Sequence, residues 1–194
     1  MKRNILVIGV IGAIVCSLTG CGKKGEVKVQ PVEVQTAGTV AIGFDYTKRE
    51  GYSSNQYAIW IEDEKGDLVK TVCATQFTAQ GGYEKRAESI PMWVEKSGIS
   101  TYDQEQVDAI TTATPNTGKV MYLWDCKNEK GEQVPSGVYT FFVEGTIYKK
   151  SGVLYSGKID ISGGACEVEA VPEFTTDEAA ESDLIVDVYA KYLP

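Results

Sequence analysis

The chain has 194 residues, with 19 basic and 27 acidic side chains, no histidine and a formal net charge of −8 at pH 7. The acidic balance disfavours binding to nucleic acid and to anionic lipid headgroups. The lack of histidine excludes Ser-His-Asp and Cys-His catalysis as well as histidine-ligated zinc. Composition therefore moves the expectation away from hydrolases, and we expect that the protein is not an enzyme.

The N-terminus carries an export signal. Lys2 and Arg3 precede an apolar run at residues 5–15, which is too short to span a bilayer, and the letters Leu-Thr-Gly-Cys end at Cys21. This order resembles a bacterial lipoprotein signal. The resemblance implies a diacylglycerol, with palmitate-type chains, on the Cys21 thiol and cleavage before Cys21. The alternatives are an uncleaved anchor and a chance apolar segment.

The predicted organisation has three parts. Residues 1–20 form the signal, residues 21–38 form a lipid-anchored tether with a possible edge strand around Pro31, and residues 39–194 form one domain. The signal holds two basic and no acidic residues, so its removal leaves 17 − 27 = −10. Membrane attachment on the extracytoplasmic side is then expected to come from acyl chains rather than from a basic patch.

Alternating apolar and polar residues predict strands along most of the domain. They fall at residues 39–46, 57–62, 68–73, 120–124, 138–143, 153–161 and 184–190. A turn through Gly66 joins the second and third strands into a hairpin. We expect exposed loops at residues 103–117 and 167–183. The pattern predicts an all-β fold, an immunoglobulin-like antiparallel sandwich of about eight strands, with a barrel as the alternative.

One segment breaks the strand pattern. Residues 84–97 contain Pro91 early in a stretch with helical character that ends near Gly98. We interpret it as a short helical insertion in the sandwich.

Three cysteines remain in the domain: Cys73, Cys126 and Cys166. Their number permits one disulfide with one free thiol, or three thiols. Their spacings are wide and include no C-x-x-C pair, so we expect small buried hydrophobic side chains and no metal site.

Three separated blocks resemble an uncharacterised family of predicted periplasmic bacterial proteins across residues 39–194. They are Tyr-Ala-Ile-Trp-Ile-Glu-Asp at 57–63, Trp-Asp at 124–125 with Pro-Ser-Gly-Val-Tyr at 135–139, and the closing residues 189–194. Cys126 stands where the family pattern has Gly. Members of that family are often encoded beside FMN transferases and membrane proteins with peptidase-propeptide-like domains, so the resemblance implies extracytoplasmic redox work.

A second resemblance concerns Asp108, Thr111, Ala113 and Thr114. Their spacing is similar to the D-x-x-[ST]-G-A-[ST] acceptor motif of covalently flavinylated proteins. The resemblance implies that Thr114 is esterified by the phosphate of FMN, and that the other three residues are read by the transferase. Thr112 replaces the usual Gly, whose backbone freedom a β-branched residue lacks. The alternative is a Thr-rich loop that leads into the next strand.

Two functions follow from these features. The first is an electron-transfer accessory that carries covalent FMN, with an FMN transferase and membrane redox proteins as partners and no nucleic acid. The second is a non-catalytic binding module of the cell envelope. Four aromatic residues are candidates either to stack on the flavin or to fill the core: Tyr83, Trp93, Tyr122 and Trp124.

Overall fold

The computed structural model describes residues 38–51 and 53–194. The chain divides into two units, Met1–Val34 and Gln35–Pro194, and the description below concerns the second. The lipidation residue Cys21, the signal and the strand expected around Pro31 lie outside the described residues.

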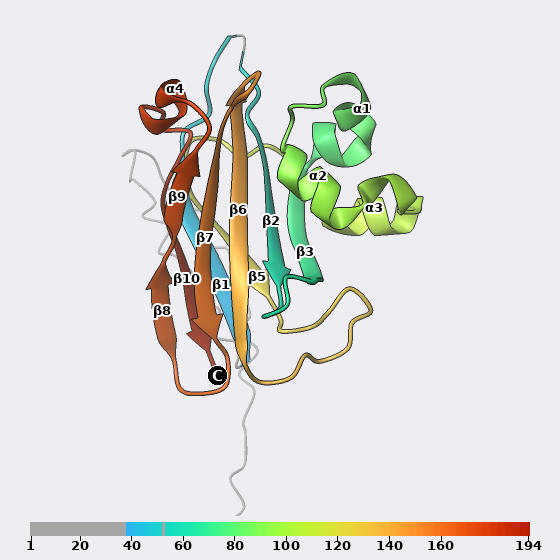
Figure 1. Cartoon of the computed structure of the whole chain (residues 1–194), viewed down its shortest axis with the longest axis vertical. Coiled ribbons are helices and arrows are strands. Elements are labelled where there is room, and N and C mark those ends of the chain that lie inside the picture. The colour runs from blue at the N-terminus through green and yellow to red at the C-terminus, as the bar shows by residue number, and fades with distance from the viewer. Residues whose placement is uncertain (1–37, 52) are drawn as a thin grey trace, which may run out of the picture. The chain divides into compact units, whose positions relative to one another are not determined.

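Two sheets face each other across a hydrophobic core (Figure 1). The four-stranded sheet has the order β5 (Gly118–Trp124), β1 (Thr39–Tyr46), β10 (Ile185–Leu193), β8 (Cys166–Glu169). The six-stranded sheet has the order β4 (Thr111–Thr112), β3 (Leu68–Thr75), β2 (Gln56–Glu62), β6 (Val138–Tyr148), β7 (Ser151–Asp160), β9 (Val171–Phe174). All pairings are antiparallel except that of β4 with β3. The predicted antiparallel sandwich is confirmed.

Alternation along the strands explains how the core forms. On β1, Val40, Ile42 and Phe44 point into the space between the sheets and are almost fully buried. Tyr57 on β2 meets Phe44 edge-on, with 5.5 Å between the ring centroids. This arrangement is a favourable one for two aromatic rings.

Helices form a further layer on the outer side of β2 and β3 (Figure 1). They are the π-helical turn η1 (Thr78–Gly82), α1 (Tyr83–Lys85), α2 (Pro91–Ser97), the 3-10 turn η2 (Ile99–Thr101) and α3 (Gln104–Ile110). Trp93 of α2 is fully buried, and its indole Nε1 donates to the hydroxyl of Thr71 on β3 at 3.3 Å. The helical layer therefore has its own core against the six-stranded sheet.

The helical insertion is longer than predicted. The prediction of a loop at residues 103–117 is wrong for Gln104–Ile110, which form α3. Two hydrogen bonds cap this helix: Gln106 N donates to Asp103 Oδ1 at 2.9 Å, and Asp103 N donates to Gln106 Oε1 at 3.0 Å. This reciprocal pair satisfies two free donors of the first turn, which stabilises a helix with few packing residues.

The loop expected at residues 167–183 is also wrong. The segment contains most of β8, all of β9 and the short helix α4 (Asp177–Ala180). β8 pairs with β10 and β9 pairs with β7 through their backbones, although their side chains are mostly exposed. Together with β4, these strands bring the number among the described residues to ten rather than about eight.

The three domain cysteines are free thiols, as one of the two alternatives expected. Cys73 and Cys126 are buried and Cys166 is half-buried. Burial raises the pKa of the Cys73 thiol, and burial with the nearby Asp125 carboxylate raises the pKa of Cys126 to about 11. Both buried thiols are therefore protonated at neutral pH and act as small hydrophobic side chains.

In the part of the chain that the structure describes, no helix has the length and apolar character needed to cross a membrane.

Candidate functional site

The acceptor-like motif begins on a helix and ends on a loop. Asp108 lies exposed on α3, where its Oδ1 accepts a hydrogen bond from Gln104 Nε2 at 2.8 Å. Thr111 belongs to β4 and donates its hydroxyl to the carbonyl of Val107 at 2.7 Å. Ala113 is exposed and Thr114 half-buried in the loop between β4 and β5. The structure thus presents the motif's last hydroxyl on irregular backbone.

Thr112 adopts ordinary strand backbone. It belongs to β4, pairs with Thr75 in register, and is not among the residues with a positive φ. Its hydroxyl lies 3.4 Å from the phenol oxygen of Tyr122. A β-branched residue adopts this strand backbone readily, so the departure from the motif causes no local strain.

Thr114 borders a hollow of about 680 Å³, which we call the Thr114 hollow. Its lining comes from the start of β2, the segment after β3, η1 with α1, and the loop after β4. The lining residues are Gln56, Gln76, Phe77, Gln80, Gly81, Gly82, Glu84, Lys85 and Thr114. No hydrogen bond of the Thr114 hydroxyl is found within residues 38–51 and 53–194, and no buried side-chain oxygen of these residues lacks a partner, so the Thr114 oxygen reaches the surface.

Phe77 provides the aromatic wall of the Thr114 hollow. Phe77 is 40% exposed and is one of six exposed large hydrophobic residues among the described residues. The Arg86 guanidinium carbon lies 5.0 Å from the centroid of the ring. A Cβ atom added to Gly82 would lie 2.6 Å from two ring carbons, so the ring packs directly on the Gly82 backbone. These contacts fix the orientation of the ring.

Gln56 forms a rigid part of the hollow. It is buried, its Oε1 accepts from the hydroxyls of Thr75 at 2.7 Å and Thr78 at 3.1 Å, and its Nε2 donates to Ser54 O at 3.2 Å. Because the amide oxygen and the amide nitrogen both form hydrogen bonds, the Gln56 side chain is held in one orientation. The charged groups at the hollow are Glu84 and Lys85, both exposed and of opposite sign.

The aromatic residues considered from the sequence lie elsewhere. Trp93 and Trp124 are buried in the two hydrophobic clusters and do not line the Thr114 hollow. The Tyr122 hydroxyl bonds to that of Tyr57. Tyr83 lines a neighbouring hollow, which shares Gln80 and Gly81 with the Thr114 hollow. Phe77 was not singled out from the sequence. The available signal was that an apolar residue stands in a polar stretch.

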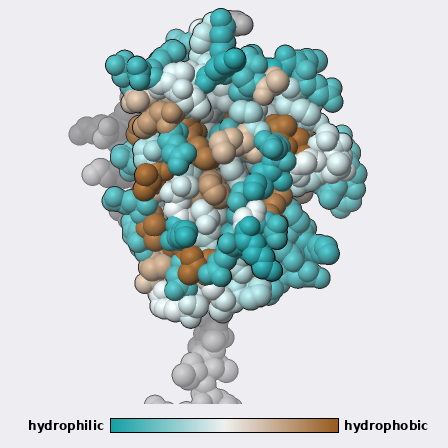
Figure 2. All heavy atoms as spheres, in the orientation of Figure 1, coloured by the Kyte–Doolittle hydropathy of each residue, from teal (hydrophilic) through white to brown (hydrophobic). Residues whose placement is uncertain are grey.

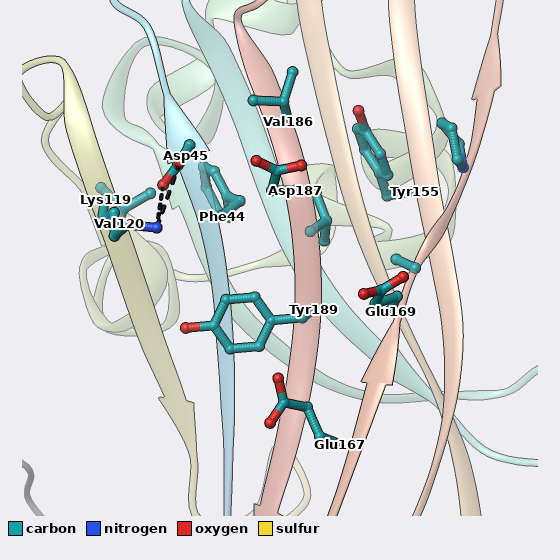
Figure 3. A pocket seen from close by; sticks show the side chains of 13 residues that line it. Phe44, Asp45, Lys119, Val120, Tyr155, Glu167, Glu169, Val186, Asp187 and Tyr189 are labelled. Atoms are coloured by element: carbon teal, nitrogen blue, oxygen red, sulfur yellow. Dashed lines mark hydrogen bonds and ion pairs between the residues drawn. The ribbon is translucent and has the colours of Figure 1, made fainter.

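A second hollow, of about 530 Å³, lies over the four-stranded sheet and its border with β7 and β9 (Figure 3). Tyr189 lies across it, with Glu167, Glu169 and Asp187 around the ring. The Lys119 ammonium pairs with Asp45 at 3.2 Å. Asp187 has a φ of 54° where the pairing of β10 with β1 shifts register. This hollow holds exposed carboxylates but none of the motif residues.

Hydrophobic residues also reach the surface. On the face drawn in Figure 2 they gather over the strands, whereas the margin by the helices is mostly hydrophilic. On β9, Val171 is 67% exposed and Phe174 41% exposed. On β5, an edge strand among the described residues, Met121 is 58% exposed and Leu123 47% exposed.

Fold and site together define a class: a two-sheet β-sandwich protein with a helical layer and a surface hollow bordered by an accessible threonine. The chain belongs to the family described as predicted periplasmic protein (DUF2271), whose model matches residues 37–173. The family resemblance seen in the sequence is thereby confirmed, and the family description indicates an extracytoplasmic location.

The comparisons give little beyond the family. No curated protein matches this sequence. Among solved structures, truncated FlgD from Helicobacter pylori is 16% identical, over 82% of this chain and 85% of that chain, with a TM-score of 0.34.

Proposed function

We propose that this protein is an extracytoplasmic electron carrier, anchored by lipid at Cys21, that holds FMN in a phosphodiester bond to Thr114. One observation carries the proposal. The last hydroxyl of the motif has no hydrogen bond within the described part of the chain and opens on a hollow with an aromatic wall. Asp108 and Ala113 are both exposed, which leaves these two motif residues accessible to a transferase.

The attachment step is a phosphoryl transfer without oxidation or reduction. A separate transferase uses a flavin dinucleotide as donor. The bond from Thr114 Oγ to the flavin-side phosphorus forms, the bond from that phosphorus to the leaving nucleoside monophosphate breaks, and the hydroxyl proton passes to the transferase. The carrier contributes an exposed acceptor, and the catalytic groups belong to the transferase.

Once attached, the isoalloxazine would perform the redox chemistry, and the protein would supply orientation and electrostatics. The flavin would accept electrons from a reduced membrane redox protein and pass them to a second, oxidised redox protein. The lipid on Cys21 would hold the carrier close to both partners.

Absorption spectroscopy tests this proposal. We expect the protein, coexpressed with an FMN transferase and purified under denaturing conditions, to keep a flavin spectrum. Thr114→Ala should be colourless. The matched control is Thr117→Ala, which removes a neighbouring hydroxyl of the same loop and should stay yellow. Colour retained by Thr114→Ala, or absent from all three proteins, would refute attachment at this residue.

The second candidate is the binding module, and the exposed apolar residues of β5 favour it. As an edge strand within the described residues, β5 offers unpaired backbone groups with Met121 and Leu123 exposed beside them. A photocrosslinker at Met121 should then label one envelope protein, while the same probe at exposed Lys130 should not.

A further inference from the structure

We infer that the flavin ring binds in the Thr114 hollow and that Phe77 is the aromatic residue on which the isoalloxazine packs. This inference rests on the proposed attachment of FMN to Thr114. It adds what the attachment motif leaves open, namely where the ring lies and which side chain shapes its properties.

The hollow has the dimensions of a small-molecule site. Its volume of about 680 Å³ falls within the range of roughly 300–1,000 Å³ that ligand pockets occupy. Thr114 and Phe77 both line it, although they come from opposite ends of the helical insertion. A group linked to the Thr114 hydroxyl therefore has the Phe77 ring within the same hollow.

Phe77 is prepared for stacking before any ligand is present. Gly82 and Arg86 support the ring from its own segment, and 40% of the side chain still faces solvent. Ordering a free side chain on binding costs free energy, whereas a ring already fixed avoids most of that cost. A planar aromatic ligand would cover apolar surface that the chain itself leaves open.

The polar groups of the hollow fit the same arrangement. Gln56 is held in place, because its amide oxygen accepts from Thr75 and Thr78 and its amide nitrogen donates to Ser54. The Glu84 carboxylate would repel the single negative charge of the phosphodiester. The Lys85 ammonium at the same hollow would offset that repulsion. Gly81, where an added Cβ would meet nothing within 4 Å, leaves space at the rim.

Tyr83 is the competing aromatic residue. It lines the neighbouring hollow together with Tyr102 and Val107, and Thr114 does not line that hollow. The geometry therefore selects Phe77 over Tyr83.

Flavin fluorescence tests the inference, because an indole in contact with an excited flavin transfers an electron to it and quenches its emission. We expect Phe77→Trp to lower the emission of the flavinylated protein several-fold, with the FMN content of each sample fixed by intact mass. Met92→Trp is the matched control. Met92 is 51% exposed and does not line the Thr114 hollow, so emission should stay at the level of the unsubstituted protein.

A second variant, Phe77→Leu, keeps an apolar side chain and removes the ring. Loss of most of the induced visible circular dichroism of the flavin would support stacking on Phe77. Full FMN content with unchanged emission in Phe77→Trp and an unchanged dichroic spectrum in Phe77→Leu would overturn the inference and leave the proposed function intact. Absence of the FMN mass from every variant would overturn both.

Discussion

At the scale of single residues, Glu144 is the most unusual group of the described structure. Its carboxyl group is buried between the six-stranded sheet and the helices. The backbone N–H groups of Met92 and Trp93 donate to its two oxygens at 3.1 Å and 2.8 Å, which holds the start of α2 on β6. Burial raises the pKa of Glu144 from 4.5 to about 7, and these two hydrogen bonds oppose the shift only in part.

This shift predicts a pH dependence of stability. A carboxyl whose pKa is raised in the folded state stabilises the fold below its unfolded pKa, and that contribution is lost as pH rises through the folded value. For Glu144 the window runs from pH 4.5 to about 7, and the free energy of unfolding should fall by about 3 kcal/mol across it.

Urea unfolding of the protein and of Glu144→Gln, at pH 5 and pH 8, measures this contribution. The variant lacks the titrating group, so its stability should change less between the two pH values. Equal changes in both proteins would show that Glu144 titrates normally in the folded state.

Gly82 gives a second prediction at this scale. An added Cβ would clash with the backbone carbonyl oxygen of Phe77 and would lie 2.6 Å from its ring, so Gly82→Ala should lower the free energy of unfolding by about 1–3 kcal/mol. Gly163→Ala is the control, because an added Cβ there meets nothing within 4 Å. Thermal unfolding of both variants should separate them, and equal stability would mean that neither the backbone nor the ring of Phe77 lies against Gly82.

At the scale of elements, the helical insertion depends on few large side chains. Trp93 and Ile90 are fully buried in the cluster that joins α2 to β2 and β3, and Trp60 of β2 stacks on Phe142 of β6 with 4.9 Å between the ring centroids. The insertion also places Phe77 opposite the Thr114 loop, so its packing shapes the hollow.

Trp93→Ala should therefore lower the free energy of unfolding by about 3–5 kcal/mol, as expected for the loss of a buried indole. The adjacent residue of the same helix, Met92, is 51% exposed, and Met92→Ala should change stability by less than about 0.5 kcal/mol. Chemical denaturation compares the two. A small effect of Trp93→Ala would show that the helical layer contributes little to global stability.

The same elements show what the sequence could predict. β1 and β2 were predicted because their apolar residues follow the period of a strand facing the core. β9 has four exposed residues, so its pairing with β7 leaves no hydrophobic pattern to detect. α3 has few apolar residues, and its capping pair of Asp103 and Gln106 was the signal available.

The candidate site could also be predicted only in part. The motif located Thr114 on a loop, since Pro115 and Gly118 follow it closely. Phe77 could not be assigned, because it lines the same hollow as Thr114 only through the folding of the insertion. Single-sequence patterns report local structure rather than such long-range placement.

At the scale of the whole molecule, the proposal joins an extracytoplasmic family, a lipid anchor and a redox group. The formal charge of −8 gives the protein no net electrostatic attraction to anionic membranes. In the proposed function, membrane attachment would therefore depend on acyl chains at Cys21.

Cys21→Ser should move the protein from the membrane fraction to the soluble fraction of fractionated cells, because the serine hydroxyl does not accept the diacylglycerol. Cys126→Ser, which removes a buried thiol of the domain, should leave the protein with membranes. Retention of Cys21→Ser on membranes would show that another segment or partner provides the anchor.

The most direct test of the central claim is the intact mass of the protein after coexpression with an FMN transferase. We predict a mass gain equal to FMN minus water, which is absent from Thr114→Ala and present in Thr117→Ala. An unmodified mass for the unsubstituted protein, or the same gain in Thr114→Ala, would contradict the account.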